Sequence, residues 1–325
     1  MARYLVTGVA GFIGSRTAEI LLEAGHQLVG VDNLNDAYDV RVKEYRLERL
    51  RGHRGFRFER LDIADRSAVA AAASSGGDFD GVVNLAARAG VRASVENPWV
   101  YLDTNVTGTL NLLEFCRSRG VPKFVLASSS SVYGVESSIP YREDQDTSRP
   151  ISPYAASKKG AETLCHSFHS LHGLDVTVLR YFTAYGPAGR PDMSVFRFTQ
   201  AIREGRPIYV YGDGSMSRDF TYLDDIARGT VAALEPLGYE IINLGGDHPY
   251  QVIELVRLIE QRLGRRAKIE FEEAHPADVL ATWADIHRAE KLMGWRPQVS
   301  LEEGISRTVE WYESERHWAE KIPAY

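Results

Sequence analysis

Short apolar runs alternate with longer amphipathic runs along the first half of the chain. The apolar runs are rich in β-branched residues and have the length of buried strands, so we expect strands at 3–7, 27–31, 56–60, 81–84 and 123–127. Between them, apolar residues recur at helical spacing, which predicts helices at 12–24, roughly 38–50 and 107–119. This alternation is typical of a parallel sheet with helices on both faces. The predicted fold class is therefore α/β, a doubly wound parallel Rossmann sheet.

A further helix is expected near the middle of the chain. Ser152 can cap it, Pro153 suits the first helical position, and the helical pattern continues to about residue 172. A strand at 176–181 should follow this helix. Beyond that strand the spacing becomes irregular, with a helix near 194–204 and a strand at 208–211.

These patterns predict two domains that no flexible linker separates. The first is a Rossmann domain over 1–181, with a return to it near 222–245. The second is a smaller C-terminal α/β lobe that occupies most of 182–325. We expect the two to share an interface and a cleft.

Composition and charge narrow the function classes. The chain has 325 residues and a net charge of -6, and no block of Lys and Arg could neutralise a row of phosphates, so we expect neither nucleic acid nor a membrane as partner. No stretch is long and uncharged enough to cross a bilayer. The two cysteines, Cys116 and Cys165, are not spaced as metal ligands. A disulfide framework is therefore not expected, and a cytoplasmic protein that acts on small molecules is.

Glycines follow the first strand at a spacing that suits a dinucleotide. Gly8, Gly11 and Gly14 would let the backbone approach a pyrophosphate, whose charge rests on the amino terminus of the next helix. Asp32 ends the second strand, where a carboxylate accepts hydrogen bonds from the ribose hydroxyls of NAD and repels the additional phosphate of NADP. Because Asn33 and not an arginine comes next, NAD is the expected cofactor. The alternative is that Asp32 is a plain turn residue.

Two more segments should lie on the same edge of the sheet. Asp62 and Ile63 follow the third strand, where they can hold the adenine. Leu85, Ala86 and Ala87 follow the fourth strand, where small side chains leave room for the dinucleotide. Open α/β sheets bind their ligands at this edge.

Tyr154 and Lys158 are one helical turn apart and can share a face of the predicted helix. A tyrosine hydroxyl is a poor base at neutral pH, but a lysine ammonium and a positive nicotinamide ring beside it stabilise the phenolate. Tyr154 then becomes an acid/base catalyst with Lys158 as its electrostatic partner. A surface pair, with the lysine stem over the ring, is the alternative.

Four serines, 128–131, follow the fifth strand and offer a second hydroxyl for the same substrate oxygen. They could also be only a polar strand end. Two other sets of polar residues are interpreted as structural and not as catalytic or metal-binding. The charge run 41–51 is interpreted as a solvated helix face, and His166, His169 and His172 lack the spacing and acidic neighbours of a zinc site, so no metal is expected.

Several of these motifs together resemble one family. They are the three glycines, "SSSSVYG" at 128–134, Tyr154 with Lys158, "YFTAYGP" at 181–187, and "RDFTYLDD" at 218–225. In this combination the chain resembles the extended short-chain dehydrogenase/reductase family, among its nucleotide-sugar epimerases. The segments "DNLNDAYD", "AGVRAS" and "GRPDM" are most similar to those of UDP-glucuronate 4-epimerases.

The resemblance implies roles for matching positions. Ser129 would be the catalytic hydroxyl, Tyr154 the base, and Lys158 the residue that also holds the nicotinamide ribose. Cofactor contacts would come from Gly8, Gly11, Phe12, Ile13, Gly14, Asp32, Asn33, Asp62, Ile63, Leu85, Ala86, Ala87, Asn105, Tyr154, Lys158, Tyr181 and Phe182. Contacts to a UDP-sugar would come from Arg92, Ser128, Ser129, Ser130, Thr183, Arg190, Tyr211, Arg218 and Asp278. The family's arginine shortly before Asp278 is His275 here, so the chain departs from the family at one phosphate contact.

The resemblance also implies a reaction, in which carbon 4 of the sugar is oxidised to a ketone and reduced again on its other face while NAD stays bound. A homodimer is expected on the same ground, paired through the helix at 107–119 and the tyrosine helix. Arg190 and Thr183 would hold the carboxylate of glucuronate, because a bidentate arginine grips carboxylate firmly. A solvated loop arginine is the alternative for Arg190.

Four rival functions share the cofactor site. UDP-glucose/UDP-galactose 4-epimerases usually have Asn at the position of Thr183. UDP-glucuronate decarboxylases and 4,6-dehydratases generally carry a carboxylate before "VYG", where this chain has Ser131. A non-catalytic NAD-binding regulator tends to lose the tyrosine or the lysine, and both are present.

Overall fold

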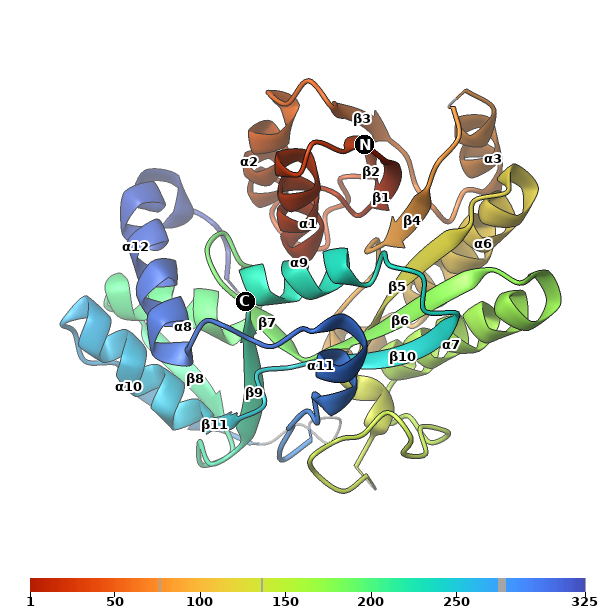
Figure 1. Ribbon diagram of the computed structural model, residues 1–325. Coiled ribbons are helices and arrows are strands. Elements are labelled where there is room, and N and C mark those ends of the chain that lie inside the picture. The colour runs from red at the N-terminus through yellow and green to blue at the C-terminus, as the bar shows by residue number, and fades with distance from the viewer. Residues whose placement is uncertain (76, 136, 274–278, 325) are drawn as a thin grey trace.

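A seven-stranded parallel sheet forms the centre of the molecule (Figure 1). The computed structural model describes residues 1–325 except 76, 136, 274–278 and 325. The strand order is β3-β2-β1-β4-β5-β6-β10. The strands are β1 (Arg3–Thr7), β2 (Gln27–Asp32), β3 (Phe56–Arg60), β4 (Gly81–Asn84), β5 (Lys123–Ser129), β6 (Asp175–Tyr181) and β10 (Tyr239–Leu244). The predicted doubly wound α/β class is confirmed.

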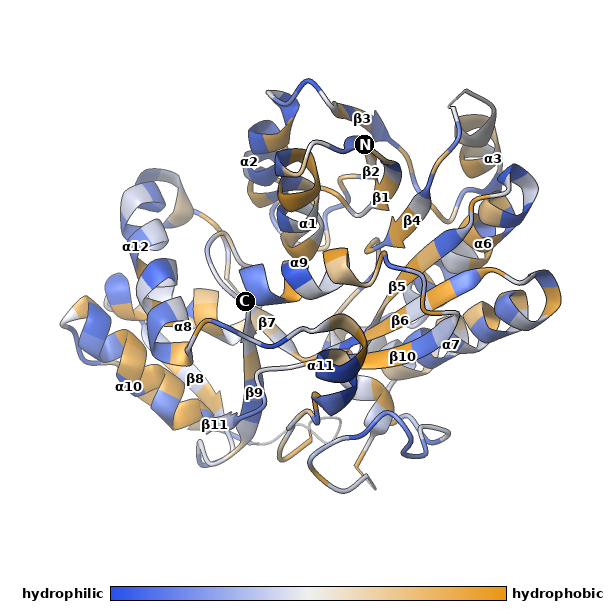
Figure 2. Ribbon diagram, viewed as in Figure 1, coloured by the Kyte–Doolittle hydropathy of each residue, from blue (hydrophilic) through white to orange (hydrophobic). Residues whose placement is uncertain are grey.

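Helices cover both faces of this sheet. One apolar cluster joins the sheet to α1 (Phe12–Glu23), α2 (Val40–Arg51), α9 (Leu223–Ala232) and α11 (His287–Met293). A second cluster on the other face joins it to α3 (Arg66–Ser75), α6 (Gly108–Arg119) and α7 (Pro153–His172). Figure 2 shows the inner strands as apolar and the outer turns of the covering helices as mixed. The strands therefore read as continuous apolar runs, as expected where both faces are buried.

The predicted helices begin and end close to their expected residues because local signals fix them. The Ser152 side chain caps α7 by accepting from the amide of Ala155 at 3.1 Å, and Pro153 occupies the first turn. Gly173 ends the same helix in a left-handed conformation. Asp39 caps α2, which begins two residues later than predicted.

The sheet extends from β1 in two directions, with β2 and β3 on one side of it and β4, β5, β6 and β10 on the other, so the strand order reverses between β1 and β4. Segments that leave β1 and β4 at their carboxyl ends therefore diverge to opposite faces and leave a crevice. Open α/β sheets bind ligands at such a point. Short turns border it, namely α4 (Val91–Glu96), α5 (Trp99–Tyr101), the π-type turn η1 (Leu102–Thr107) and the 3₁₀ turn η2 (Ser130–Tyr133).

The remaining elements have their own apolar cluster. Two small sheets form here, one of β7 (Thr183–Tyr185), β9 (Ser217–Tyr222) and β11 (Pro249–Gln251), the other of β8 (Pro207–Tyr211) and β12 (Lys268–Glu272). The helices are α8 (Ser194–Arg203), α10 (Val252–Leu263) and α12 (Leu301–Ala319). Between them the chain returns to the large sheet, where β10 pairs in parallel with β6.

None of the helices in the described part of the chain has the length and apolar character that crossing a bilayer requires.

Candidate active site

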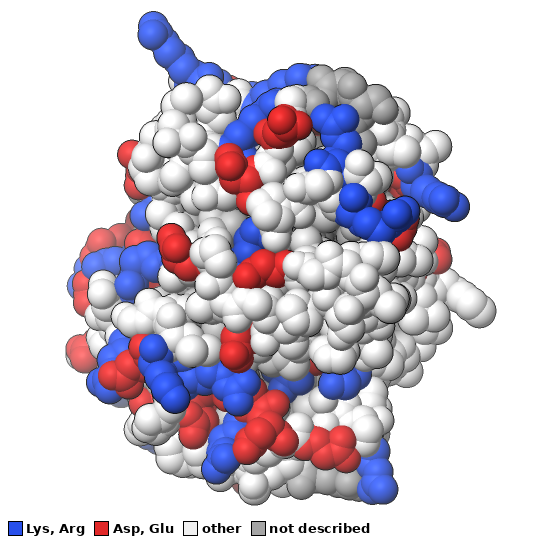
Figure 3. Space-filling model, turned by 45° about the vertical axis from the view of Figure 1, so that its right-hand side comes forward, with Lys and Arg blue, Asp and Glu red and all other residues white. Residues whose placement is uncertain are grey.

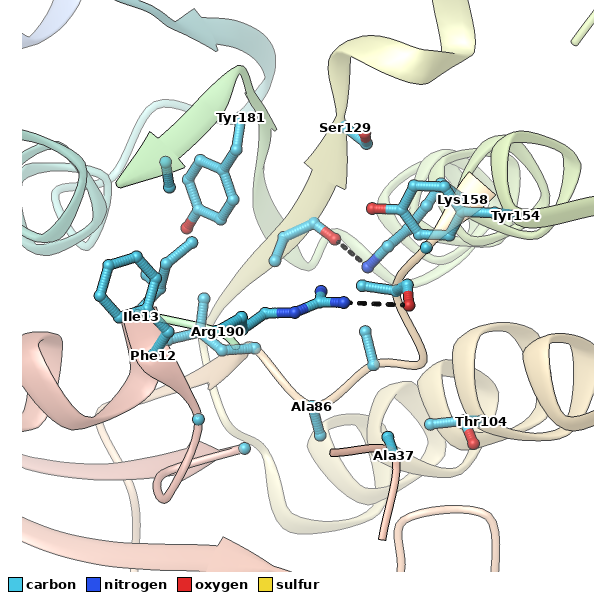
Figure 4. Close-up of a pocket in the computed structure, with 18 of the residues that line it drawn as sticks. Phe12, Ile13, Ala37, Ala86, Thr104, Ser129, Tyr154, Lys158, Tyr181 and Arg190 are labelled. Atoms are coloured by element: carbon cyan, nitrogen blue, oxygen red, sulfur yellow. Dashed lines mark hydrogen bonds between the residues drawn. The ribbon is translucent and has the colours of Figure 1, made fainter. Parts of the chain in front are cut away.

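A cavity of about 430 Å³ opens along the carboxyl edge of the large sheet. Its wall is built from the ends of β1, β2, β4, β5 and β6 on one side and from segments after residue 182 on the other. Figure 4 shows Phe12 and Ile13 on one side of this pocket and Tyr154 with Lys158 on the opposite side. The switch in strand order therefore coincides with this cavity.

The glycine loop between β1 and α1 leaves no room for side chains. Gly8 has a φ of +66°, and a Cβ there would lie 2.6 Å from the amide nitrogen of Ala86. A Cβ on Gly14 would lie 2.1 Å from the carbonyl oxygen of Gly8. Gly8, Gly11 and Gly14 thus line the cavity as bare backbone at the amino terminus of α1, whose N-cap is Gly11. This cradle fits the pyrophosphate of a dinucleotide.

Asp32 is oriented by the loop that follows the first strand. Its carboxylate accepts from the Ala10 amide at 3.1 Å and from the Leu34 amide at 2.8 Å, and the side chain is buried. Asn33 next to it donates to the Asp62 carboxylate at 2.9 Å, which ties the ends of β2 and β3 together. Two acidic groups therefore face the cavity at the place where a ribose and its adenine would lie.

Tyr154 projects from α7 into the cavity beside Ser129 (Figure 4). Burial raises the pKa of Tyr154 above its ordinary value, while the hydrogen bond with Ser129 and the charge of Arg190 act in the opposite direction. The ring also packs edge-on against Tyr101, with centroids 6.1 Å apart. The Ser129 hydroxyl accepts from the Ser131 amide at 3.2 Å and thereby caps the amino terminus of η2, which fixes its position.

Lys158 lines the same wall, one turn further along α7. Its ammonium donates to the Ala127 carbonyl at 2.7 Å rather than to Tyr154. Burial lowers the pKa of Lys158 to about 8, and the negative charge of Glu162 limits this fall. The Tyr154–Lys158 pair is therefore part of a pocket wall and not a surface pair, with the ammonium held at strand β5.

A buried ion pair lies directly behind these residues. Arg180 and Glu162 form two hydrogen bonds of 3.0 and 2.9 Å, and both side chains are almost completely excluded from water. Glu162 also accepts from the Ser128 hydroxyl at 2.6 Å. The guanidinium lies over the ring of Tyr133, 4.8 Å from its centroid. The strand end that carries Ser128 and Ser129 is thus anchored to α7.

Arg190 reaches into the cavity from the loop after β7 (Figure 4). It forms a bidentate ion pair with Asp192, at 3.1 and 2.5 Å, and donates to the Ala89 carbonyl at 3.3 Å. Its side chain is 23% exposed, so a solvated loop arginine does not describe it. Thr183 lines the same part of the pocket.

Most of the predicted site residues line this one cavity. Those that do are Gly8, Gly11, Phe12, Ile13, Gly14, Asp32, Asn33, Asp62, Ile63, Leu85, Ala86, Ala87, Ser128, Ser129, Ser130, Tyr154, Lys158, Tyr181, Phe182, Thr183, Arg190 and Arg218. Their roles toward a cofactor or substrate stay predictions.

Three predicted residues lie outside the cavity wall, and one is not described. Asn105 is buried behind it, where its side chain bonds the backbone of Arg88 and the Ser157 hydroxyl. The Arg92 guanidinium lies over the ring of Tyr211, 3.6 Å from its centroid, so α4 contacts the end of β8 here. Asp278 and His275 fall outside the described residues.

The interpretation of the charge run 41–51 as a solvated face was wrong for two residues. Lys43 is 5% exposed and Arg46 is 3% exposed. Lys43 lines the cavity, together with Asn35, Ala37 and Tyr38 of the preceding loop. The helical spacing of Val42, Leu47 and Leu50 marks the buried face of α2, and Lys43 and Arg46 lie next to it. That spacing was the sequence signal from which the burial of Lys43 and Arg46 could have been predicted.

Comparison with known proteins gives consistent matches along the chain. Residues 4–245 match the model of the NAD dependent epimerase/dehydratase family. A UDP-glucuronate 4-epimerase of Thermodesulfobacterium geofontis is 55% identical over 312 residues, which cover 96% of each chain. The crystal structure of UDP-glucuronic acid 4-epimerase from Bacillus cereus, in complex with UDP-glucuronic acid and NAD, has a TM-score of 0.90 at 36% identity, covering 96% of this chain and 99% of that one.

A second solved structure resembles the chain to a similar degree. The UDP-glucose 4-epimerase of Thermotoga maritima, with UDP-glucose, has a TM-score of 0.89 at 33% identity. The match covers 97% of this chain and 99% of that one.

Lys158 should make the stability of the cofactor-free protein depend on pH. Its pKa is about 8 in the folded chain and 10.5 ordinarily, so between these values the unfolded chain holds a proton that the folded chain has released. The free energy of unfolding therefore rises with pH across this window, by up to about 3 kcal/mol, and Lys158→Met lacks that contribution. Urea unfolding of both proteins at pH 7 and pH 10 measures it: the stability of the parent should gain on that of the variant as pH rises.

The matched control is Lys291→Met, which removes an exposed lysine on α11 and should leave the pH dependence unchanged. Equal pH dependence of the parent and Lys158→Met would contradict the burial of a charged ammonium at this site.

Proposed function

The chain belongs to the NAD dependent epimerase/dehydratase family, and on this premise we propose that it is an NAD-dependent 4-epimerase that converts UDP-glucuronate to UDP-galacturonate. The observation that carries the proposal is the meeting of Ser129, Tyr154 and Lys158 with Arg190 in one cavity that begins at a bare glycine loop. The similarity to UDP-glucuronate 4-epimerases over nearly the whole chain supports the substrate.

The proposed chemistry assigns a proton transfer to Tyr154. When bound, NAD supplies a hydride acceptor that is regenerated within each cycle. Tyr154 takes the proton of the sugar hydroxyl at carbon 4 and returns it after the keto ring has turned over. Ser129 bonds the same oxygen, and the ammonium of Lys158 favours the ionised form of the tyrosine. Burial raises the pKa of Tyr154 in the cofactor-free protein, and the positive nicotinamide ring would add to the stabilisation of the phenolate by the charges of Lys158 and Arg190.

We propose that the two predicted domains bind different ligands. Residues 1–181, with the return near 222–245, hold NAD through the glycine loop, Asp32, Asn33, Asp62 and Ile63. Residues 182–325 mainly hold the UDP-sugar, and Arg218, Val279 and Thr282 on the cavity wall support this. Asp278 is proposed to bind the ribose of UDP, and Tyr211 to lie close to the uracil.

Arg190 is proposed to select the acidic sugar. Its Nε and Nη2 atoms are held by the carboxylate of Asp192, which fixes the plane of the guanidinium, so a glucuronate carboxylate would be bound from the side of Nη1. A carboxylate held in this way is also kept in a fixed orientation, which opposes its loss from the keto intermediate. Ser131 at the position before "VYG" supports epimerisation without decarboxylation.

The proposed setting is cytoplasmic, with UDP-sugar and not nucleic acid as the ligand. Cys116 and Cys165 are both buried thiols, and burial raises the pKa of each, which suits a reducing compartment. Figure 3 shows Lys and Arg interspersed with Asp and Glu over the face that it presents, and not the continuous basic field that binds phosphates.

Tyr154→Phe should lower the rate of epimerisation by about a hundredfold or more, because the proton acceptor is lost while the ring packing stays. The measurement is formation of UDP-galacturonate from UDP-glucuronate, followed by NMR. NAD content and melting temperature should match the parent and serve as the control. A variant as fast as the parent would sink the proposed mechanism.

Arg190→Ala should lower kcat/KM for UDP-glucuronate by about 10- to 100-fold, since a charge-assisted bidentate contact is lost. Turnover of UDP-glucose, measured in parallel, should not fall. Arg190→Lys keeps the charge without the planar fork and should recover only part of the activity. Unchanged turnover of UDP-glucuronate by Arg190→Ala would instead favour the UDP-glucose/UDP-galactose alternative.

We also propose a homodimer formed through α6 and α7. Exposed apolar side chains gather on and before α6, at Val95, Trp99, Leu102 and Leu110, and Leu171 is 74% exposed near the end of α7. Light scattering should give about twice the chain mass of 36.3 kDa, and Leu110→Glu should shift it toward the monomer. A monomeric parent protein would contradict this.

A further inference from the structure

Lys43 is a buried cation that the proposed mechanism does not use. It lies on the first turn of α2, lines the cavity and is 5% exposed. Its ammonium donates to the backbone carbonyl of Asn35 at 2.8 Å and to the side-chain oxygen of Asn35 at 3.0 Å. An ammonium has three protons to donate, so one remains for a ligand after both of these bonds.

No carboxylate among the described residues lies within ion-pair distance of this ammonium. Burial lowers the pKa of Lys43 to about 8, Asp32 limits the fall, and the charges of Arg88, Arg46 and Arg190 add to it. At neutral pH the group is still an ammonium, surrounded by more positive than negative charge. A buried charge of this kind is costly unless a counterion completes its environment.

The other basic residues on the cavity wall belong to other parts of the site. Lys158 is held at β5 beside Tyr154, and Arg190 and Arg218 come from segments after residue 182. Among the basic residues of the described cavity wall, Lys43 is the one that comes from α2, the helix after β2, and its charge interacts with that of Asp32 at the end of this strand. The negative charge that reaches this side is that of the dinucleotide.

Arg46 fixes the position of Lys43 relative to the glycine loop. It follows Lys43 by one helical turn, and its guanidinium donates to the Ala10 carbonyl at 3.3 Å and to the Tyr38 hydroxyl at 2.7 Å. The Tyr38 ring lies under the Lys43 ammonium, 5.1 Å from its centroid. The first turn of α2 is thereby held against the amino terminus of α1, where the pyrophosphate is expected.

We propose that Lys43 binds the pyrophosphate of the dinucleotide and supplies the counter-charge that the bare amides of the glycine loop lack. The inference rests on the proposed function only in taking NAD as the dinucleotide. Asn35 acts as the positioning residue that holds the ammonium through two acceptors. The loop 35–38 and α2 are in this way part of the cofactor site.

The test compares Lys43→Met with the parent by calorimetric titration of cofactor-free protein, with no UDP-sugar present. NAD and ADP should each bind about 10- to 100-fold more weakly to the variant, because a charge-assisted contact to phosphate is lost. Adenosine, which has no phosphate, should bind both proteins equally. Lys291→Met removes an exposed lysine on α11 and is the matched control, with unchanged affinity for all three ligands.

Each outcome decides the inference. Equal affinity of the parent and Lys43→Met for NAD and ADP would overturn it, and an equal loss for adenosine would assign Lys43 to the ribose and overturn the phosphate contact. If Lys43→Met has a lower melting temperature, Lys43→Gln keeps a donor for Asn35 without the charge and gives the same comparison. A parent protein that binds no NAD would contradict the proposed function, whereas an unaltered variant contradicts only the role of Lys43.

Discussion

The site depends on a buried ion pair, Arg180 with Glu162, from which water is excluded behind the carboxyl edge of the sheet. Arg180 and Glu162 are each about 1% exposed, and removing one partner of such a pair costs about 3–5 kcal/mol because the other charge stays buried. Since Glu162 also holds Ser128, and lies one turn beyond Lys158 on α7, the pair joins β5, β6 and α7 at the point where the proposed proton transfer occurs. Positions of the hydroxyls and of the ammonium are therefore set by the interior and not by the loops.

The central sheet and the position of several site residues at one sheet edge could be predicted because the relevant signals are local. Gly8, Asp32 and Tyr154 each stand at the end of a strand or on a helix whose bounds follow from the hydrophobic pattern. Their common place at one sheet edge then follows from the parallel topology alone.

The rest could not be predicted because it depends on partners far away in the chain. Lys43 and Arg46 lie in a charged run that has the composition of a solvated face, yet Arg46 bonds the carbonyl of Ala188, 142 residues further on, at 2.9 and 2.6 Å. The stack of Arg92 on Tyr211 and the buried position of Asn105 likewise come from packing between distant segments. Arg46 also holds Ala188 at a φ of +52°, a conformation that non-glycine residues seldom adopt, so the loop that leads to Arg190 is fixed from the cofactor side.

The position of β10 has a consequence for how the protein is made. The strand joins the large sheet beside β6, although 57 residues separate the end of β6 at Tyr181 from Tyr239. While the chain is still being translated, the hydrogen-bonding groups on the outer side of β6 have no partner strand until residues 239–244 have left the ribosome exit tunnel. For that interval the nascent polypeptide presents an open strand edge, the kind of surface that chaperones shield and that pairs with other unfinished chains.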